Sequence, residues 1–164
     1  MLRTIIFMKA AQKFTLALGI TYLLVGTLGF IPALVSQPEA MDAAIQQYGV
    51  TAGYGYFLGI LPVNAPMNII HIATGLVSLF ATIALDSSRF ISGQVGIYYT
   101  LLTVLGVLPF ANSAFGLFPL YGGEVVLHGL TGLAGIYCGF FLTPSLLKVF
   151  KQELREDATA AEVL

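Results

Sequence analysis

The stretch GILPVNAPMNIIHIATGL (59–76) decides the fold, because GLFPLYGGEVVLHGLTGL (116–133) repeats its pattern without a gap. The offset is constant at 57 residues (128 − 71 = 57), so His71 matches His128 and Thr74 matches Thr131. These two histidines are the only ones in the chain. The sequence therefore predicts an internal repeat in which each half carries one histidine at the same position.

The composition indicates a membrane protein. The 164 residues are 57% hydrophobic and only 9% charged, whereas soluble domains carry about 25% charged residues. Long apolar runs separated by short polar loops are typical of a multi-pass membrane protein. A net charge of −1 gives no basic field for nucleic acid. The single cysteine, Cys138, excludes an intramolecular disulfide. We therefore expect membrane lipid around the chain and no nucleic-acid partner.

Four segments are apolar enough to cross a bilayer as helices of about 20 residues. They run from Phe14 to Val35, Ala65 to Leu85, Phe90 to Ala111 and Gly123 to Thr143. The motif LGFIP (28–32) recurs as LGVLP (105–109), at an offset of 77 residues (105 − 28 = 77), which extends the repeat to the first and third segments. The predicted fold is an all-α, four-helix transmembrane bundle (14–143) made of two parallel two-helix repeats, 14–85 and 90–143.

The basic residues predict the orientation of these helices. All seven lie before the first predicted helix, between the second and third, or after the fourth, which places them on one side of the membrane. The positive-inside rule then predicts cytoplasmic N and C termini, so that 1–13 and 144–164 are cytoplasmic segments. Within 144–164 the pattern favours an amphipathic helix at the inner surface, followed by a mobile tail. We expect a bacterial inner (plasma) membrane or thylakoid protein, with the long outer loop 36–64 as the place for a protein partner.

Small residues follow each histidine at positions +4, +7 and +11. They are Gly75, Ser78 and Thr82 after His71, and Gly132, Gly135 and Gly139 after His128. Each set lies on one helical face, and small residues let membrane helices approach closely. We therefore expect the second and fourth helices to pack against each other through these two stripes, with a histidine at the head of each.

Several roles are open to the two histidines. A structural role would fix the register of the helices by hydrogen bonds to neighbours such as Asn68 or Glu124. Alternatively, His71 and His128 would be the axial ligands of one b-type haem, or would face a lipid, quinone, pigment or proton path. Zinc uses about four ligands, and two histidines with Glu124 are too few, so the sequence assigns no metal site.

No arrangement of residues points to catalysis: the histidines lack a neighbouring serine and acid at membrane depth, and no phosphate-binding glycine loop is present. The leading hypothesis is a non-enzymatic membrane protein of accessory or scaffold type. The alternatives are a haem-, pigment- or quinone-binding protein that uses His71 and His128, and a small transporter or channel along the axis between the repeats.

The motif PVNAPMNIIHIATGL (62–76), with LGFIP before it and FGLFPLYGGEVVLH (115–128) after it, resembles the bacterial membrane family known as domain of unknown function 4383. The family pattern Asn-x-x-His-Asn-x-x-His reads here Asn64, Met67, Asn68 and His71. This chain departs from it at Met67, which stands where the pattern has its first histidine. The resemblance implies a small four-helix integral membrane protein and supplies no activity.

Overall fold

The computed structural model describes residues 9–37, 53–142, 151 and 154–155. Four helices dominate this part of the chain: α2 (Ala10–Leu28), α4 (Ala65–Ala81), α5 (Leu85–Val107) and α6 (Gly123–Ile136), the last continued by the π-helical turn η3 (Tyr137–Leu142). The prediction of a mainly helical, four-helix protein is confirmed. Three helices, α2, α5 and α6 with η3, are long and apolar enough to cross a membrane, and α4 is an apolar helix of 17 residues.

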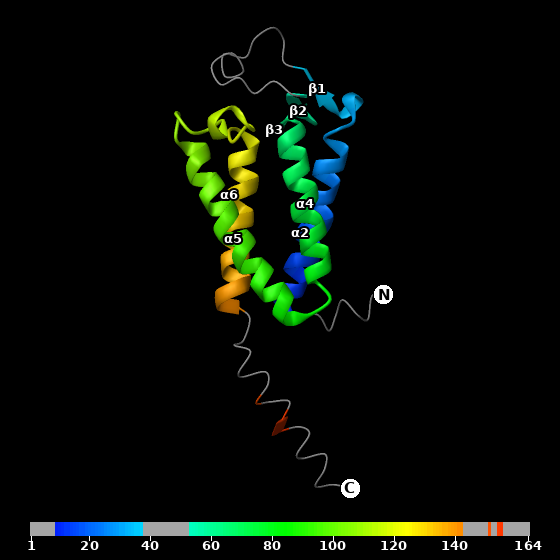
Figure 1. Ribbon diagram of the computed structural model, residues 1–164, viewed down its shortest axis with the longest axis vertical. Helices are drawn as coiled ribbons and strands as arrows, with labels where there is room; N and C mark the ends of the chain where they lie inside the picture. The colour runs from blue at the N-terminus through cyan, green and yellow to red at the C-terminus, as the bar shows by residue number, and fades with distance from the viewer. Residues whose placement is uncertain (1–8, 38–52, 143–150, 152–153, 156–164) are drawn as a thin grey trace.

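The helices form two antiparallel hairpins. α2 packs along α4 and α5 packs along α6, while the contacts between the hairpins are fewer (Figure 1). The short turn between α4 and α5 joins the hairpins at the end where the chain enters α2 (Figure 1). All four helices therefore have one end at this turn and the other at the loops opposite.

Local signals in the sequence explain where the helices begin and end. α4 starts after Asn64, as predicted, because the side-chain oxygen of Asn64 accepts a hydrogen bond of 2.9 Å from the backbone N–H of Met67. The predicted end of the first helix at Val35 was wrong: α2 stops at Leu28, and Ile31 is extended because it precedes Pro32. The third helix likewise ends at Val107 and not at the predicted Ala111. The helical conformation is unfavourable for a residue that precedes a proline.

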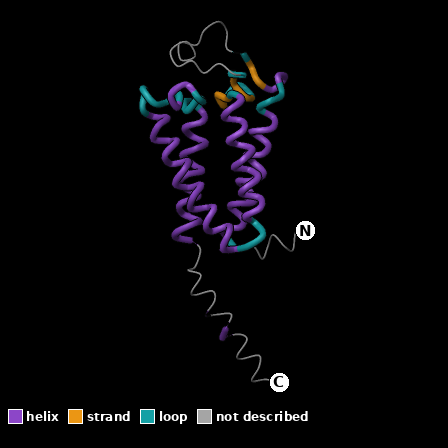
Figure 2. The backbone as a smooth tube through the Cα atoms, viewed as in Figure 1, coloured by secondary structure: helices purple, strands orange, loops and turns teal. Residues whose placement is uncertain are grey.

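The outer end, opposite the α4–α5 turn, holds a small antiparallel sheet that was not predicted. It comprises β1 (Val35–Ser36), β2 (Gly55–Phe57) and β3 (Leu61–Val63), with Val35 opposite Phe57 and Tyr56 opposite Pro62 (Figure 2). Strands of two or three residues are too short to leave a periodic signal in the sequence. The rest of the predicted partner loop, residues 38–52, lies outside the described residues. So does most of the predicted C-terminal amphipathic helix, of which only residues 151, 154 and 155 are described.

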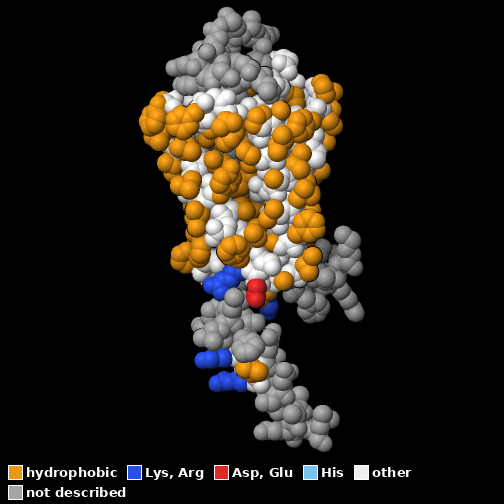
Figure 3. Space-filling view, viewed as in Figure 1, with side chains coloured by type: hydrophobic (Ala, Val, Ile, Leu, Met, Phe, Trp, Pro, Cys, Tyr) orange, Lys and Arg blue, Asp and Glu red, His pale blue; other side chains and the backbone are white. Residues whose placement is uncertain are grey.

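The surface is apolar, and the interior holds polar as well as apolar side chains. Large hydrophobic side chains point outward along every helix, and Ile69, Phe80 and Leu133 expose 59%, 72% and 68% of their surface. Figure 3 shows these side chains as a broad belt, with the basic and acidic groups gathered below it. Buried polar residues occur on all four helices, among them Thr15, Ser78 and Ser92. This inverted distribution is the one expected for a protein surrounded by lipid.

The small-residue stripes pack inside the hairpins, so the prediction that the second and fourth helices meet stripe to stripe was wrong. A Cβ atom added at Gly75 would lie 2.7 Å from the backbone nitrogen of Leu23 on α2. One added at Gly132 would lie 2.8 Å from the backbone nitrogen of Thr100 on α5. Gly135 and Gly139 also meet α5 backbone, whereas Ser78 and Thr82 lie on the same side of α4 toward α2 and the α4–α5 turn. The stripes set the close approach within each hairpin and leave the histidines between the hairpins.

Candidate functional site: a buried His–Glu–His cluster

The two histidines meet between the two hairpins, together with one carboxylate. His71 lies on α4, and Glu124 and His128 lie one turn apart on α6. The Nε2 atoms of the two imidazoles are 3.5 Å apart. The Oε2 atom of Glu124 is 3.0 Å from Nε2 of His128 and 3.6 Å from Nε2 of His71. All three side chains are fully buried.

Helix starts place the cluster at the same depth in both hairpins. Asn64 caps α4, and its side-chain N–H donates a hydrogen bond of 2.9 Å to the carbonyl of Leu117, in the loop that leads to α6. α6 begins at Gly123, so Glu124 lies in its first turn, where the helix dipole favours a negative charge. Each histidine then follows its helix start by about the same rise, about 1.5 Å per residue. Leu120, in the loop before α6, is fully buried and packs with Tyr22 and Tyr99 in one core cluster.

Two tyrosines flank the cluster and connect the hairpins. The ring of Tyr22 (α2) meets the imidazole of His71 edge-on, with centroids 4.9 Å apart, and its hydroxyl shares a hydrogen bond of 2.9 Å with Thr131 on α6. The ring of Tyr99 (α5) lies 4.8 Å from the imidazole of His128, and its hydroxyl shares a hydrogen bond of 2.9 Å with Thr74 on α4. Each tyrosine therefore bonds a threonine of the opposite hairpin.

Sequence reasoning missed the tyrosines, although the repeat contained the signal. Tyr22 and Tyr99 differ by 77 positions (99 − 22 = 77), the offset of the LGFIP motif, and Thr74 and Thr131 differ by 57 (131 − 74 = 57), the offset of the histidines. Aligning the two offsets together would have identified both pairs. It would not have shown that each tyrosine bonds the threonine of the opposite half, because that depends on how the hairpins pack.

Several polar atoms of the site have no hydrogen-bond partner among the described residues. They include Nδ1 of His71, Nδ1 of His128 and Oε1 of Glu124. Buried polar atoms are rarely left without a partner, and exceptions are typical of sites that are completed by an ion or water. No lysine or arginine in the described part of the chain forms an ion pair with Glu124. Among the described residues, the two imidazoles are thus the ion-pair partners of the buried carboxylate.

The three facing atoms have the spacing of metal ligands. Atoms separated by 3.0, 3.5 and 3.6 Å have a common centre about 2.0 Å from each, which is the length of a Zn–N or Zn–O bond. Two histidines and one glutamate also form the ligand set of several catalytic zinc sites, which keep a further position open. The sequence assigned no metal site because it counted too few ligands. The geometry brings three of them together around one point.

A haem does not fit between these histidines. Axial ligands of one iron would stand about 4 Å apart on opposite faces of a flat macrocycle. Here the Oε2 atom of Glu124 lies within 3.6 Å of both Nε2 atoms, in the place that the macrocycle would need. The rings of Tyr22 and Tyr99 pack directly on the imidazoles. The expectation of axial haem ligation by His71 and His128 is therefore incompatible with this geometry.

Comparison with known proteins identifies a family and no activity. No curated protein and no solved structure matches the chain. One family model, described as Domain of unknown function (DUF4383), matches residues 12–141, which include all four helices almost completely and every residue of the cluster. The chain therefore belongs to the DUF4383 family.

Proposed function

We propose that this protein is a non-enzymatic, multi-pass membrane protein of accessory type, whose two hairpins are joined at the centre by a metal ion bound to His71, Glu124 and His128. The observation that carries the proposal is the convergence of three ligand atoms from two separate hairpins on a point about 2.0 Å from each. The ion would hold α4 against α6, which share few direct contacts. It would thus act as a cross-link between the halves of the bundle.

Electrostatics supports a cation at this point. A buried carboxylate without a charged partner is costly in a protein interior, and more so within a membrane. The Oε2 atom of Glu124 lies 3.0 and 3.6 Å from the two imidazole Nε2 atoms, and no lysine or arginine of the described residues forms an ion pair with it. A metal ion between the three side chains would compensate the carboxylate charge and would use the lone pairs of both Nε2 atoms. Bound protons would compensate the same charge without a metal, and elemental analysis distinguishes the two cases because it measures metal directly.

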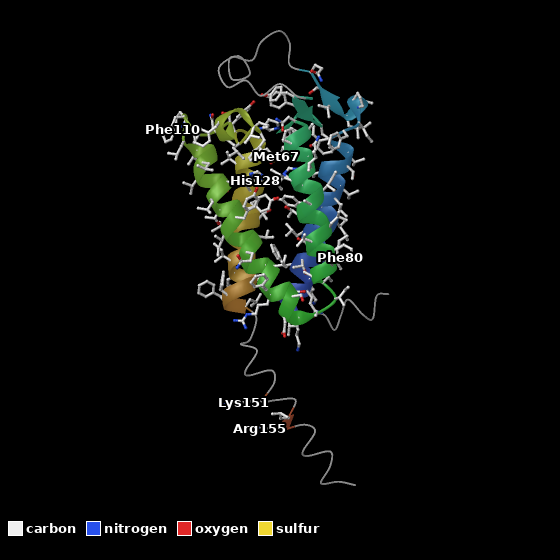
Figure 4. The ribbon with its side chains drawn as sticks, in the orientation of Figure 1. Met67, Phe80, Phe110, His128, Lys151 and Arg155 are labelled. Carbon is white, nitrogen blue, oxygen red and sulfur yellow. The ribbon has the colours of Figure 1, made fainter. Side chains whose placement is uncertain are left out.

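The proposed arrangement in the membrane has all four helices spanning, with both termini on the cytoplasmic side. Lys9, Lys13 and Arg89 lie at the end of the molecule that holds the α4–α5 turn, and Lys151 and Arg155 lie below it (Figures 3 and 4). Basic residues collect on the cytoplasmic side of membrane proteins. The 17 residues of α4 extend about 25 Å, which approaches the hydrocarbon thickness of about 30 Å. A bacterial inner membrane or a thylakoid membrane would suit this topology.

We also propose that the two hairpins are parallel repeats related by a pseudo-twofold axis along the membrane normal. The support is the reciprocal pattern at the site. Tyr22 pairs with Thr131, and Tyr99, at the equivalent position, pairs with Thr74. The two histidines face each other across the same axis. On the outer side, the segment 36–64 remains the proposed place for a protein partner, because it gives the first half an extension that the second half lacks.

The proposal is tested by the metal content of the protein purified from membranes in detergent. We expect one transition-metal ion per chain in the wild type by elemental analysis, and metal at background level in Glu124→Gln and in His128→Gln. Both substitutions keep a polar side chain of similar length, and circular dichroism would verify that the helices persist. Asp86→Asn is the matched control, since Asp86 is an exposed carboxylate at the inner end. Equal metal content in wild type and site variants, or no metal in any of them after incubation with metal salts, would overturn the proposal.

A further inference from the structure

We propose that Met67 supplies a fourth ligand to this site, and that the metal it selects is monovalent copper. This inference rests on the proposed metal site and adds to it the identity of the ion. Met67 lies on α4 one turn before His71, so the two side chains share one face of the helix. It is fully buried in the cluster of core residues that contains Tyr22 and Tyr99, the two rings that pack on the histidines.

The repeat relates Met67 to a residue of the site. Adding the offset of 57 positions to Met67 gives Glu124 (67 + 57 = 124), just as it converts His71 to His128. Glu124 reaches both Nε2 atoms from one turn before His128. Met67 holds the corresponding place on α4, one turn before His71, in the opposite hairpin. Figure 4 shows Met67 and His128 at similar heights in the bundle. A centre bound by one residue pair from each hairpin would have four ligands, the number that structural metal sites use.

The chemistry of this ligand set favours Cu(I). A thioether is a soft ligand that suits Cu(I), whereas zinc sites are built from cysteine, histidine and carboxylate side chains. The net charge of the site also favours Cu(I), independently of ligand softness. One Cu(I) ion and one carboxylate make a neutral centre with two neutral imidazoles, while a divalent ion would leave a net positive charge. A fully buried site surrounded by lipid-facing helices favours the neutral combination.

The experiment compares two metals in two variants of the full-length protein. In a Cys138→Ser background, which removes the competing thiol, purified protein is titrated with Cu(I) under reducing, oxygen-free conditions against a chromophoric Cu(I) chelator, and separately with Zn(II). We expect Met67→Leu, which preserves side-chain volume, to weaken Cu(I) binding at least tenfold and to leave Zn(II) binding within about twofold. Met67→His should strengthen Zn(II) binding at least tenfold. X-ray absorption of the Cu(I) form should show a sulfur neighbour that is lost in Met67→Leu.

Leu18→Ile, a change that preserves volume at another buried position of the same core cluster, is the control for packing and should change neither affinity. If Met67→Leu binds Cu(I) as tightly as the wild type, Met67 is a packing residue and the inference is wrong, while the metal site of His71, Glu124 and His128 stands. If the wild type prefers Zn(II) and shows no sulfur neighbour with Cu(I), the assignment to copper is also wrong. If no metal binds the wild type but the variants remain folded, the proposed function itself fails. These outcomes are distinct, because the first two retain metal binding and the third does not.

Discussion

At the scale of single residues, the interior of this protein is unusual in its use of hydroxyl groups. Tyr22 and Tyr99 each have an aromatic ring against a histidine and a hydroxyl that bonds a threonine of the other hairpin. Within a membrane such bonds cannot be exchanged for bonds to water, and double-mutant cycles give them about 0.6 kcal/mol on average and up to about 1.7 kcal/mol. They are modest individually, but their position allows them to hold the imidazoles in place.

The Tyr99–Thr74 bond can be measured by a double-mutant cycle. We expect Tyr99→Phe and Thr74→Val each to destabilise the protein, with a coupling energy of about 0.6 kcal/mol between them. The measurement is reversible unfolding in mixed detergent micelles, followed by circular dichroism. Tyr98→Phe is the control, since the neighbouring Tyr98 is 39% exposed, and it should have little effect. A coupling energy of zero would show that the observed 2.9 Å contact contributes nothing to the joining of the hairpins.

At the scale of helices, close packing within each hairpin depends on glycine at a few contacts. A Cβ atom added at Gly135 would lie 2.7 Å from the Cα atom of Gly96 and 2.7 Å from the carbonyl oxygen of Ser92, both backbone atoms of α5. Neither neighbour can rotate away, so α6 would have to move as a whole. Gly129, on another face of the same helix, has a looser surrounding. A Cβ atom added there would lie 3.4 Å from the Thr103 side chain, which is an ordinary contact.

Gly135→Ala and Gly129→Ala therefore form a matched pair on one helix. We expect Gly135→Ala to destabilise the protein by about 1–3 kcal/mol, the usual cost of an extra methyl group in a well-packed interior. Gly129→Ala should be neutral or slightly stabilising, because alanine has the higher helix propensity. Unfolding in mixed micelles provides both values under the same conditions. If both variants had the same stability, the tight α5–α6 contact would not be a determinant of the fold.

At the scale of the whole molecule, the lysines and arginines among the described residues lie at one end, and the apolar side chains form a belt above it (Figure 3). Since basic residues collect on the cytoplasmic side of membrane proteins, this separation predicts one orientation in a membrane. The polar cluster lies nearer the opposite end, one to two turns inside the starts of α4 and α6. A metal that binds there is therefore enclosed by the outer loops on one side and by the length of the bundle on the other.

The orientation is testable with cysteines placed at the two ends of a Cys138→Ser protein. Leu117 is 60% exposed in the outer loop, and Asp86 is exposed beside the α4–α5 turn. We expect a membrane-impermeant maleimide to label Leu117→Cys in intact bacterial cells, and to label Asp86→Cys only after the membrane is permeabilised. If Asp86→Cys were labelled in intact cells and Leu117→Cys only after permeabilisation, the basic end would lie outside the cell. Labelling of both in intact cells would contradict a protein that spans the membrane in one orientation.

The sequence by itself determined the number of helices, the membrane character of the chain and the equivalence of His71 with His128. These features follow from local patterns: long apolar runs and a constant offset between matching segments. It also contained the clue to the tyrosines. Short strands at the outer end left no such pattern, because two or three residues are too few to show alternation.

Only the tertiary structure decided which helices meet and what gathers at their centre. The stripes of small residues correctly predicted that helices pack closely, but not which helices pack together. A stripe of small residues allows close approach of any helix and does not select one. The stripe of α4 packs against α2, and the stripe of α6 packs against α5. As a result, His71 of one hairpin faces Glu124 and His128 of the other. Distances of 3.5 and 3.6 Å between atoms more than fifty residues apart in sequence, from His71 to His128 and from His71 to Glu124, are properties of the packing alone.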